Sequence, residues 1–292
     1  MKILGTGLSG LIGSRLVELL DEYEFENLSR ETGFDIIDKE KLIENINSSD
    51  ASIIFHLAAK TDVDECEKDK SLGENGEAWK INVLGTENVV QACQLSKKKL
   101  IYVSTDFVFD GRNPPSDGYS EDENPNPINW YSKTKFEGEK IVQNSNLDWI
   151  IIRLAYPYRS NFVKKDFVRL LIEKFNKNEK LAMVTDHIMT PTFIDDIAGA
   201  FDILIKQNQK GIFHVVGSQS LTPYDAACLI AKIFDFDASL IEKTTREEFF
   251  KGRAPRPFNV SLGDDKIRRL GVRMKTFEEG LLEIKKQQKI LI

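Results

Sequence analysis

The sequence predicts an α/β protein with a doubly wound parallel sheet and a second, smaller α/β lobe. Short β-rich runs alternate with amphipathic segments through the first half of the chain, as in a sheet covered by helices on both faces. The run at 51–59 (ASIIFHLAA) is too apolar for a strand with one face in water. A glycine-rich turn joins the first β-rich run to the first amphipathic segment. Together these features are typical of a parallel sheet.

In the first half, this alternation predicts the elements one by one. The helix that starts at about residue 11 should bury an apolar side, because its apolar residues recur at helical spacing. That side would consist of Leu16, Val17, Leu19, Leu20 and Tyr23. We expect strands at 2–4, 25–29, 51–59, 100–104 and 149–154, and further helices at 41–46, 79–95 and 131–143.

After Leu154 the alternation loosens, which indicates the smaller lobe. Helices are expected at 162–175 and 194–205, strands at 181–184 and 211–216, and a charged helical tail at 264–292. We place one domain at 1–155 and the smaller lobe mostly at 156–292, interleaved because strands near 190–217 return to the first sheet. The stretch at 111–127 is rich in Pro, Asp, Asn, Ser and Glu, and should be a loop that forms a lid or rim over a site.

Composition excludes several classes of protein. With 292 residues, 41% of them hydrophobic and 29% charged, the chain is neither collagen-like nor disordered. The net charge of −6, with both signs interspersed, favours no nucleic-acid partner. Apolar runs are far too short for a membrane helix, and the glycines near the N-terminus, followed by no cleavage site, argue against a secretory signal. The odd number and wide spacing of the cysteines predict reduced, buried thiols in a cytoplasmic protein, with no metal site at Cys66, Cys93 or Cys228.

The glycine-rich turn predicts a dinucleotide site. Glycine allows a tight turn and a close approach of the backbone to a pyrophosphate, and the following helix directs N–H groups at it. Two spacings fit, GxGxxG from Gly5 and GxxGxxG from Gly7, and the second leaves the first strand its full length. Strand, turn and helix within the first twenty residues indicate a Rossmann-like fold.

The end of the second strand bears on the choice of dinucleotide. A free ribose 2′-hydroxyl usually calls for a carboxylate there, yet the segment reads Asn-Leu-Ser-Arg at 27–30. The Arg30 guanidinium suits a 2′-phosphate, so we prefer NADP(H) to NAD(H). NAD(H) stays an alternative, because Arg30 could be a solvated surface cation and Glu26 or Glu31 could bind the ribose.

Three side chains suggest acid–base chemistry. Tyr131 and Lys135 are four residues apart on a predicted helix and therefore share a face. A phenol is a poor acid or base at neutral pH unless a cation such as Lys135 lowers its pKa. Thr105 ends a predicted parallel strand, where ligands of open sheets bind, and can hydrogen-bond a carbonyl oxygen. The alternative is an exposed helix with a surface lysine.

With these residues the chain resembles the extended short-chain dehydrogenase/reductase superfamily. The resemblance covers nearly the whole length and includes TGLSGLIG at 6–13, HLAA at 56–59, ST at 104–105 and YSKTK at 131–135. It narrows to the dTDP-4-dehydrorhamnose reductase family through AAKTDVDECE at 58–67, STDFVFDG at 104–111, YSKTKFEGEK at 131–140, TPTF at 190–193 and RAPRPFNVSL at 253–262.

The resemblance implies a role for each matching residue. Tyr131 would protonate a sugar ketone while the nicotinamide supplies hydride, Lys135 would hold the nicotinamide ribose and lower the pKa of the phenol, and Thr105 would orient the carbonyl. Besides Arg30, proposed above from the end of the second strand, cofactor contacts would come from Gly7, Gly10, Leu11, Ile12, Asp35, Ile36, Ala58, Ala59, Lys60, Tyr131 and Lys135. Contacts to the nucleotide sugar would come from Asp106, Phe107, Tyr156, Asn161 and Arg256.

Some residues depart from the family pattern. His56 stands where the reductase family has Asn, Gly5 stands where an apolar residue is usual, and Tyr-Pro-Tyr-Arg at 156–159 replaces Trp-Val-Tyr-Gly. We therefore expect an altered sugar pocket. His56 and His214 lie in predicted strands and should be core residues, whereas His187 and the acidic run at 121–123 should lie in solvated loops.

The expected function is reduction of a nucleotide-linked 4-keto sugar such as dTDP-4-dehydrorhamnose, in dTDP-rhamnose biosynthesis. Two alternatives remain at this stage. One is an epimerase or dehydratase of the same fold, in which hydride leaves and returns in one cycle. The other is a non-catalytic NADP-binding regulatory subunit, like the methionine adenosyltransferase β subunit. The sequence leaves open the base, the sugar stereochemistry and whether the chain forms a homodimer.

Overall fold

The computed structural model describes residues 1–290 and contains the predicted parallel sheet. Its six strands lie in the order β2-β1-β3-β4-β5-β9, and each pair of neighbours is parallel. Because β1 lies between β2 and β3, the strand order reverses next to β1, which is where such sheets bind ligands. The strands are β1 (Lys2–Thr6), β2 (Glu24–Leu28), β3 (Ile53–His56), β4 (Lys99–Thr105), β5 (Trp149–Leu154) and β9 (Gly211–His214).

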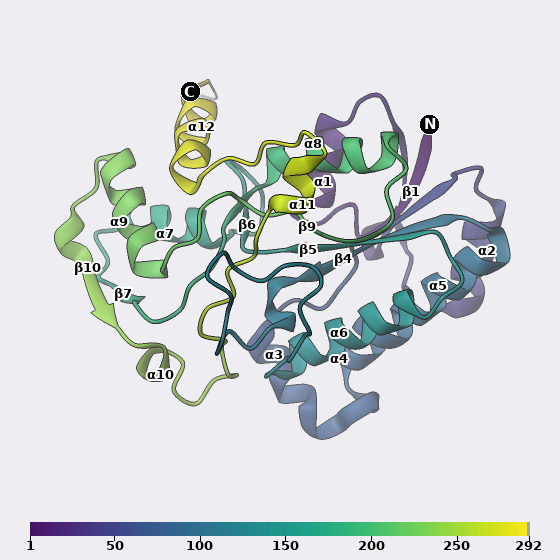
Figure 1. Ribbon diagram of the computed structural model, residues 1–292, viewed down its shortest axis with the longest axis horizontal. Coiled ribbons are helices and arrows are strands. Elements are labelled where there is room, and N and C mark those ends of the chain that lie inside the picture. The colour runs from purple at the N-terminus through teal and green to yellow at the C-terminus, as the bar shows by residue number, and fades with distance from the viewer. Residues whose placement is uncertain (291–292) are drawn as a thin grey trace.

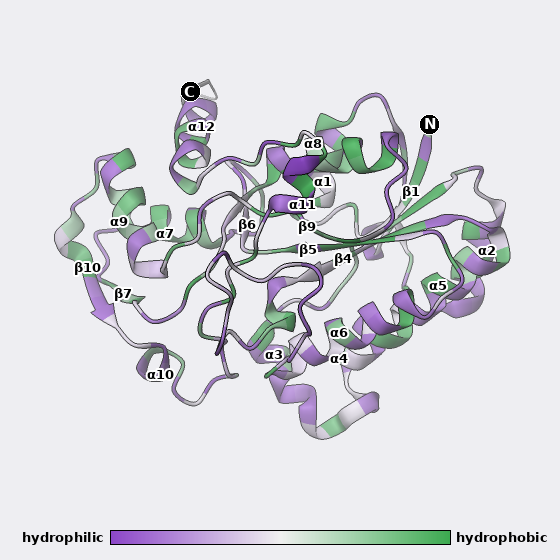
Figure 2. Ribbon diagram, in the orientation of Figure 1, coloured by the Kyte–Doolittle hydropathy of each residue, from purple (hydrophilic) through white to green (hydrophobic). Residues whose placement is uncertain are grey.

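Helices cover both faces of this sheet (Figure 1). On one face lie α2 (Lys39–Ser48), α5 (Gly85–Ser96) and α6 (Trp130–Gln143), and on the other α1 (Gly13–Leu19), α8 (Ile194–Lys206) and α11 (Asp265–Arg269). Each layer encloses its own hydrophobic cluster, one centred on α1 and α8 and the other on α2, α5 and α6. In Figure 2 these helices alternate between hydrophobic and hydrophilic residues, as amphipathic helices do.

The prediction that the first helix buries five apolar residues is only partly correct. Leu16, Leu20 and Tyr23 are buried against the sheet, but Val17 and Leu19 are exposed by 38% and 37%. Of these three buried residues only Leu16 lies within the helix, because α1 ends at Leu19. Leu20 is its C-cap and Tyr23 lies in the turn before β2.

The helix predicted at 79–95 is interrupted. It consists of α4 (Glu77–Trp79), a π-helical turn η3 (Lys80–Leu84) and α5. In this turn Asn82 Oδ1 accepts a hydrogen bond from the Lys60 backbone at 2.8 Å, while its Nδ2 donates to Thr134 Oγ1 at 2.9 Å. The π-helical turn thereby ties the loop after β3 to α6, and such turns often occur near functional sites.

A second group of elements packs beside one end of the sheet, at the left of Figure 1. It has its own hydrophobic cluster, which includes Phe175, Phe193 and Phe277. The predicted boundary between a domain at 1–155 and a lobe at 156–292 stays a prediction. The elements are β6 (Pro157–Tyr158), paired with β8 (Thr192–Phe193), β7 (Leu181–Val184), paired with β10 (Ile241–Thr244), and the helices α7 (Phe167–Asn176), α9 (Pro223–Phe234), α10 (Arg246–Phe249) and α12 (Phe277–Ile290).

Short elements complete the chain. These are α3 (Val63–Lys68) and the 3₁₀ turns η1 (Arg30–Thr32), η2 (Asp69–Asn75), η4 (Asp106–Val108) and η5 (Ala238–Leu240). The charged tail is α11 and α12, and its last two predicted helical residues, 291–292, lie outside the described residues. Among the helices of residues 1–290, none has the length and apolarity to cross a membrane. The three cysteines are free thiols, with Cys228 only partly buried.

The loop at 111–127 differs from expectation. Tyr119 is buried, stacks on Phe109 at 4.1 Å between ring centres and forms a β-bridge with Leu262. Glu121 is not solvated as predicted, because its Oε1 accepts a hydrogen bond from the His214 backbone and burial raises the pKa of its carboxyl. The loop packs on the segment at 258–263, so it is neither lid nor rim of the cleft described next.

Candidate active site

A cleft of about 760 Å³ opens at the carboxyl ends of the central strands. The glycine turn after β1, the end of β2 and the loop after β3 form one part of its wall. The end of β4, the start of α6 and the segment at 154–167 form the other part. The cleft therefore lies at the reversal of strand order between β1 and β3, where open α/β sheets bind ligands.

The glycine turn has the backbone geometry that a dinucleotide requires. β1 runs to Thr6, which favours the spacing that starts at Gly7. Gly7 has a φ of 73°, and a Cβ there would lie 2.7 Å from the Ala58 nitrogen. A Cβ on Gly13 would lie 2.5 Å from Leu8 Cα, so α1 packs against the turn only because Gly13 lacks one. Packing explains why position 5 is a glycine and not the usual apolar residue, because a Cβ there would lie 2.5 Å from Leu8 Cγ.

The residues predicted to bind the cofactor mostly line the cleft. Gly7, Gly10, Leu11, Ile12, Arg30, Asp35, Ile36, Ala58 and Ala59 are in its wall. Arg30 is 60% exposed, and its Nη2 lies 3.3 Å from Asp35 Oδ2. Lys60 is not among the lining residues, because its Nζ turns to Asp69 at 3.0 Å and to Glu77 at 2.7 Å.

Tyr131, Lys135 and Thr105 meet in the opposite wall. Asn129 caps α6 by accepting a hydrogen bond from the Ser132 nitrogen at 2.8 Å, which starts the helix at Trp130 and places Tyr131 in its first turn. Lys135 is 3% exposed, donates from Nζ to the Val103 carbonyl at 2.8 Å and lies 4.1 Å from the Tyr102 ring centre. Phenol and amine thus face the same cleft, as the four-residue spacing predicts.

Burial changes the expected electrostatics of this pair. Burial raises the pKa of Tyr131 well above its ordinary value, so the expectation that Lys135 lowers it is not met. Burial also lowers the pKa of Lys135 to about 7, with Glu139 acting in the opposite direction. The phenol therefore stays protonated at neutral pH, as a proton donor must, while the amine titrates near neutrality.

Next to them, Asp106 has an unusual environment. Its Oδ1 accepts a hydrogen bond from Thr105 Oγ1 at 2.9 Å, whereas its buried Oδ2 has no hydrogen-bond partner among the described residues. Burial raises the pKa of this carboxyl to about 7. An unpaired buried oxygen at a ligand-accessible wall is a group that a bound ligand can satisfy.

Of the other residues predicted to contact substrate, Phe107 and Tyr156 line the cleft and Asn161 and Arg256 do not. Asn161 is exposed, and the Arg256 guanidinium pairs with Asp64 at 3.0 Å. The prediction of a solvated loop at His187 is wrong. Its side chain is 2% exposed, and its Nε2 lies 2.9 Å from Tyr156 Oη.

Sequence reasoning missed the segment at 162–167, which also lines the cleft. A helix was expected from 162, but α7 starts at Phe167, because the Asp166 carboxylate caps it by accepting a hydrogen bond from the Arg169 nitrogen at 3.0 Å. The residues before this cap are not helical, and Phe162, Lys164 and Lys165 among them reach the cleft. An Asp directly before an apolar run is a helix-start signal, and could have located this boundary.

His56 is the core residue that its strand predicts. Its ring bonds Thr6 Oγ1 at 2.7 Å and Thr86 Oγ1 at 3.0 Å, and burial lowers its pKa to about 3. His214 is likewise fully buried, in β9. Both are neutral, structural histidines.

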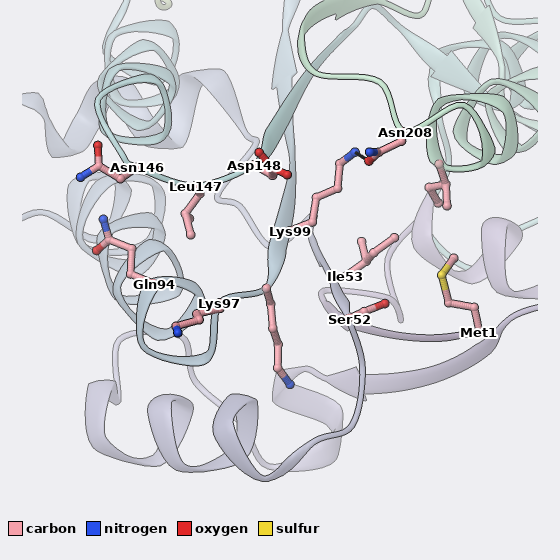
Figure 3. A pocket seen from close by; sticks show the side chains of 12 residues that line it. Met1, Ser52, Ile53, Gln94, Lys97, Lys99, Asn146, Leu147, Asp148 and Asn208 are labelled. Carbon is pink, nitrogen blue, oxygen red and sulfur yellow. Dashed lines mark hydrogen bonds between the residues drawn. The ribbon is translucent and has the colours of Figure 1, made fainter.

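A second cavity, of about 680 Å³, lies at the opposite edge of the sheet (Figure 3). Its wall includes Lys97, Lys98 and Lys99 just before and at the start of β4. Lys98 Nζ donates to the Ile46 and Ser49 carbonyls, both at 2.6 Å, and Lys99 Nζ donates to Asn208 Oδ1 at 2.9 Å. Two of the three amines are thus occupied by the protein itself, and this cavity is at the wrong edge of the sheet for the chemistry above.

The sheet, the glycine turn at its point of reversal and the Tyr131–Lys135 pair define the class of protein: a Rossmann-like protein with the fold of the extended short-chain dehydrogenases/reductases. The family described as the RmlD substrate binding domain matches residues 1–290. The chain belongs to this family, that of the dTDP-4-dehydrorhamnose reductases.

Relatives with similar sequences carry two kinds of name. The methionine adenosyltransferase 2 subunit beta of Xenopus tropicalis is 30% identical over 97% of this chain and 86% of its own length. The probable low-salt glycan biosynthesis reductase of Haloferax volcanii is 30% identical over 94% of both chains.

Among solved structures, dTDP-4-dehydrorhamnose reductase from Bacillus anthracis in complex with NADP has a TM-score of 0.88 and 31% identity over 98% of this chain and 99% of its own. A UDP-glucose 4-epimerase from Thermotoga maritima, at 22% identity and a TM-score of 0.82 over the full length of both chains, shares the fold.

Proposed function

We propose that the protein is an NADP(H)-preferring reductase of a nucleotide-linked 4-keto sugar. The observation that carries this proposal is that Tyr131, Lys135 and Thr105 share one cleft with the glycine turn. The Bacillus anthracis relative, which is a dTDP-4-dehydrorhamnose reductase solved with NADP, and the glycan biosynthesis reductase of Haloferax volcanii support the reaction class.

The proposed mechanism assigns one task to each group. A bound nicotinamide supplies the hydride, and the protein positions it and provides the proton. Tyr131 holds that proton at neutral pH, because its phenol is buried, and donates it to the carbonyl oxygen. Lys135, in its ammonium form, stabilises the phenolate that remains, and Thr105 orients the carbonyl through its hydroxyl. General-acid assistance of this kind contributes about 10²- to 10⁴-fold to a rate.

The cofactor would lie along the other wall. The backbone of Gly7 and Gly10 would face the pyrophosphate, and neither residue has room for a side chain, because a Cβ would lie 2.7 Å from the Ala58 nitrogen and 3.1 Å from the Gly7 carbonyl oxygen, respectively. Arg30, the cation in the cleft wall at the end of β2, would receive the 2′-phosphate of NADP(H). Asp35 and Ile36 would lie beside the adenine. We assign Asp106, Phe107 and Tyr156 to substrate binding, because they line the cleft. Asn161 and Arg256 are not assigned, because they do not line it.

The test is oxidation of NADPH on addition of dTDP-4-dehydrorhamnose. The Tyr131→Phe variant should bind NADPH with wild-type affinity and lose at least about 10²-fold in kcat, because it lacks the proton. Lys133→Met is the matched control, because Lys133 is on the same helix but exposed and outside the cleft. An active Tyr131→Phe variant would contradict the assignment of the proton donor.

A regulatory role is the second candidate, favoured by the similarity to methionine adenosyltransferase 2 subunit beta over 97% of this chain. It predicts NADPH binding without turnover of any nucleotide-linked keto sugar, together with a tight complex with a methionine adenosyltransferase catalytic subunit. An epimerase would instead turn over nucleotide sugars with no net change in the cofactor. NADPH balance and co-purification together separate the three functions.

A further inference from the structure

Tyr156 adopts a backbone conformation that is costly for a residue with a side chain. Its φ is 41°, in the left-handed region, which persists only where the surroundings impose it. Its carbonyl accepts a hydrogen bond from the Thr192 nitrogen, and its ring packs edge-on against Phe107 and Phe167 at 6.2 and 6.0 Å. These contacts hold the phenol in the cleft wall.

Within residues 1–290, the Tyr156 hydroxyl has one hydrogen-bond partner, His187. His187 Nε2 lies 2.9 Å from Tyr156 Oη, and its Nδ1 lies 2.8 Å from the carbonyl oxygen of Pro257. A carbonyl oxygen only accepts, so Nδ1 must carry the ring hydrogen. Burial, with Arg246 and Arg256 acting in the same direction, lowers the pKa of His187 to about 4 and keeps the ring neutral.

The direction of the hydrogen bond between the two side chains follows from this tautomer. In a neutral ring with its hydrogen on Nδ1, Nε2 is an acceptor. Tyr156 must therefore donate its hydroxyl hydrogen to His187, and Oη has only lone pairs left for the cleft. A tyrosine without such a partner could either donate to a ligand or accept from it.

Asp106 adds a second acceptor on the same side of the cleft. Its Oδ1 is occupied by the Thr105 hydroxyl, and its buried Oδ2 has no partner among the described residues. Phe107, which follows it directly, packs edge-on against Tyr156 and Tyr131 at 6.2 and 6.4 Å. In this wall the Tyr131 phenol is a hydrogen-bond donor and the Tyr156 hydroxyl oxygen is an acceptor. The Asp106 carboxylate is a second acceptor when it is ionised.

We propose that His187 is a positioning residue that makes Tyr156 an obligate hydrogen-bond acceptor and thereby selects substrates with a hydroxyl group next to the ketone. This inference rests on the proposed function and narrows its substrate class. A ketone flanked by a hydroxyl satisfies donor and acceptor together. A deoxy analogue at that carbon leaves the Tyr156 acceptor unsatisfied in a buried site, and is rejected for that reason.

The tautomer can be tested without any substrate. The chain has three histidines, His56, His187 and His214, so the ¹⁵N spectrum of histidine-labelled protein is simple to assign. We expect a neutral Nδ1–H ring at His187, with an Nε2 resonance that shifts in Tyr156→Phe as the hydrogen bond is lost. An Nε2–H tautomer, or an Nε2 resonance that does not respond to Tyr156→Phe, would overturn the proposal whether or not the protein is a reductase.

Selectivity is tested with dTDP-4-dehydrorhamnose and its 3-deoxy analogue in NADPH-dependent reduction. The wild type should prefer the hydroxylated substrate by about tenfold or more in kcat/KM, as expected for one hydrogen bond to a buried group. His187→Asn, which keeps a donor for Pro257 but removes the Nε2 acceptor, should lose most of this preference. His187→Gln, which can place an amide oxygen near the former Nε2, should restore it.

Two controls give the selectivity experiment a definite outcome. Both His187 variants must bind NADPH as the wild type does, which separates selectivity from misfolding. The double variant Tyr156→Phe/His187→Asn should be no less selective than Tyr156→Phe, because both substitutions remove the same hydrogen bond between Tyr156 and His187. Equal kcat/KM of the wild type on both sugars, or additive losses in the double variant, would overturn the inference. Reduction of neither sugar would instead contradict the proposed function, and the ¹⁵N spectrum would still decide the tautomer.

Discussion

At the scale of single residues, burial sets the protonation of the groups in the cleft. Tyr131, Lys135 and Asp106 are at most 9% exposed, and in each case burial favours the uncharged form. The Tyr131 phenol keeps its proton, while Lys135 and Asp106 each have a pKa of about 7. Two groups that titrate at neutral pH next to a protonated phenol are typical of a catalytic site.

The lowered pKa of Lys135 predicts a pH dependence. Its ammonium form is present below about pH 7 and is lost above it. If that charge stabilises the Tyr131 phenolate, kcat/KM for NADPH-dependent reduction should fall about tenfold per pH unit above the pKa that Lys135 has in the free enzyme. Lys135→Arg should remove this alkaline decrease at a lower overall rate, because a guanidinium stays charged.

Asp106 ionises in the same pH range and must be separated from Lys135. The Asp106→Asn variant should retain the alkaline decrease if Lys135 causes it. A profile that stays flat from pH 6 to about pH 9 in the wild type would contradict the role of the ammonium group.

Arg30 predicts the cofactor preference. Replacing it by Ala should raise KM for NADPH by about 10- to 100-fold, the effect of losing hydrogen bonds to a charged phosphate, and change KM for NADH little. Steady-state rates with each cofactor measure this. Arg273→Ala is the control, because Arg273 is 80% exposed and pairs with Glu279 outside the cleft. Equal losses with both cofactors would show that Arg30 does not recognise the 2′-phosphate.

At the scale of elements, α6 carries two proposed catalytic side chains and depends on close packing against the sheet. A Cβ on Gly138 would lie 2.4 Å from Tyr102 Oη and 3.1 Å from the Asn82 carbonyl. Tyr102 in turn donates a hydrogen bond to the Lys135 carbonyl at 3.2 Å. The distance between α6 and β4, and with it the position of Lys135, is therefore set by a glycine.

Two glycine-to-alanine changes test this packing. Gly138→Ala should destabilise the fold by about 1–3 kcal/mol through overpacking, and lower the reductase rate as α6 shifts. Gly199→Ala on α8 is the matched control, because a Cβ there meets nothing within 4 Å and should stabilise the helix by about 0.5–1 kcal/mol. Urea unfolding measures both free energies. A Gly138→Ala variant as stable as the wild type would refute close packing.

The sequence predicted these elements unevenly. Strand β5 and the start of α8 follow from apolar runs and have the expected bounds, because periodicity is a local property. The start of α7 was missed because a hydrogen-bonding cap at Asp166, and not periodicity, sets it. The π-helical turn before α5 was missed because it depends on contacts of Asn82 with the loop after β3.

At the scale of the whole molecule, residues between Gly7 and Phe167 line the cleft, and segments from the second half of the chain support its wall. β9 returns to the first sheet beside β5. From the second half of the chain His187 reaches Tyr156, and the Pro257 carbonyl in turn holds His187. Ligand binding at such a site should stabilise the fold as a whole, because the assembled cleft exists only in the native state.

NADPH should therefore raise the melting temperature. At about 100 times its Kd it should add about 2.7 kcal/mol to the free energy of unfolding, and NADH at the same concentration should add less. Tyr131→Phe should keep this gain, since it alters proton transfer and not cofactor binding. Thermal melts with each nucleotide measure it, and no gain with either would contradict a dinucleotide site in the cleft.

By itself, the sequence determined the alternation of strands and helices, the glycine turn at Gly7 and the shared helical face of Tyr131 and Lys135, because each follows from patterns among residues a few positions apart. Only the tertiary structure decided the pKa of Lys135, the exclusion of Lys60 and Arg256 from the cleft wall and the direction of the hydrogen bond from Tyr156 to His187. The pKa depends on burial, and the other features depend on contacts between residues far apart in the chain, such as Tyr156 and His187, 31 positions apart, and Arg256 and Asp64, 192 positions apart. Local spacing carries no information about such contacts.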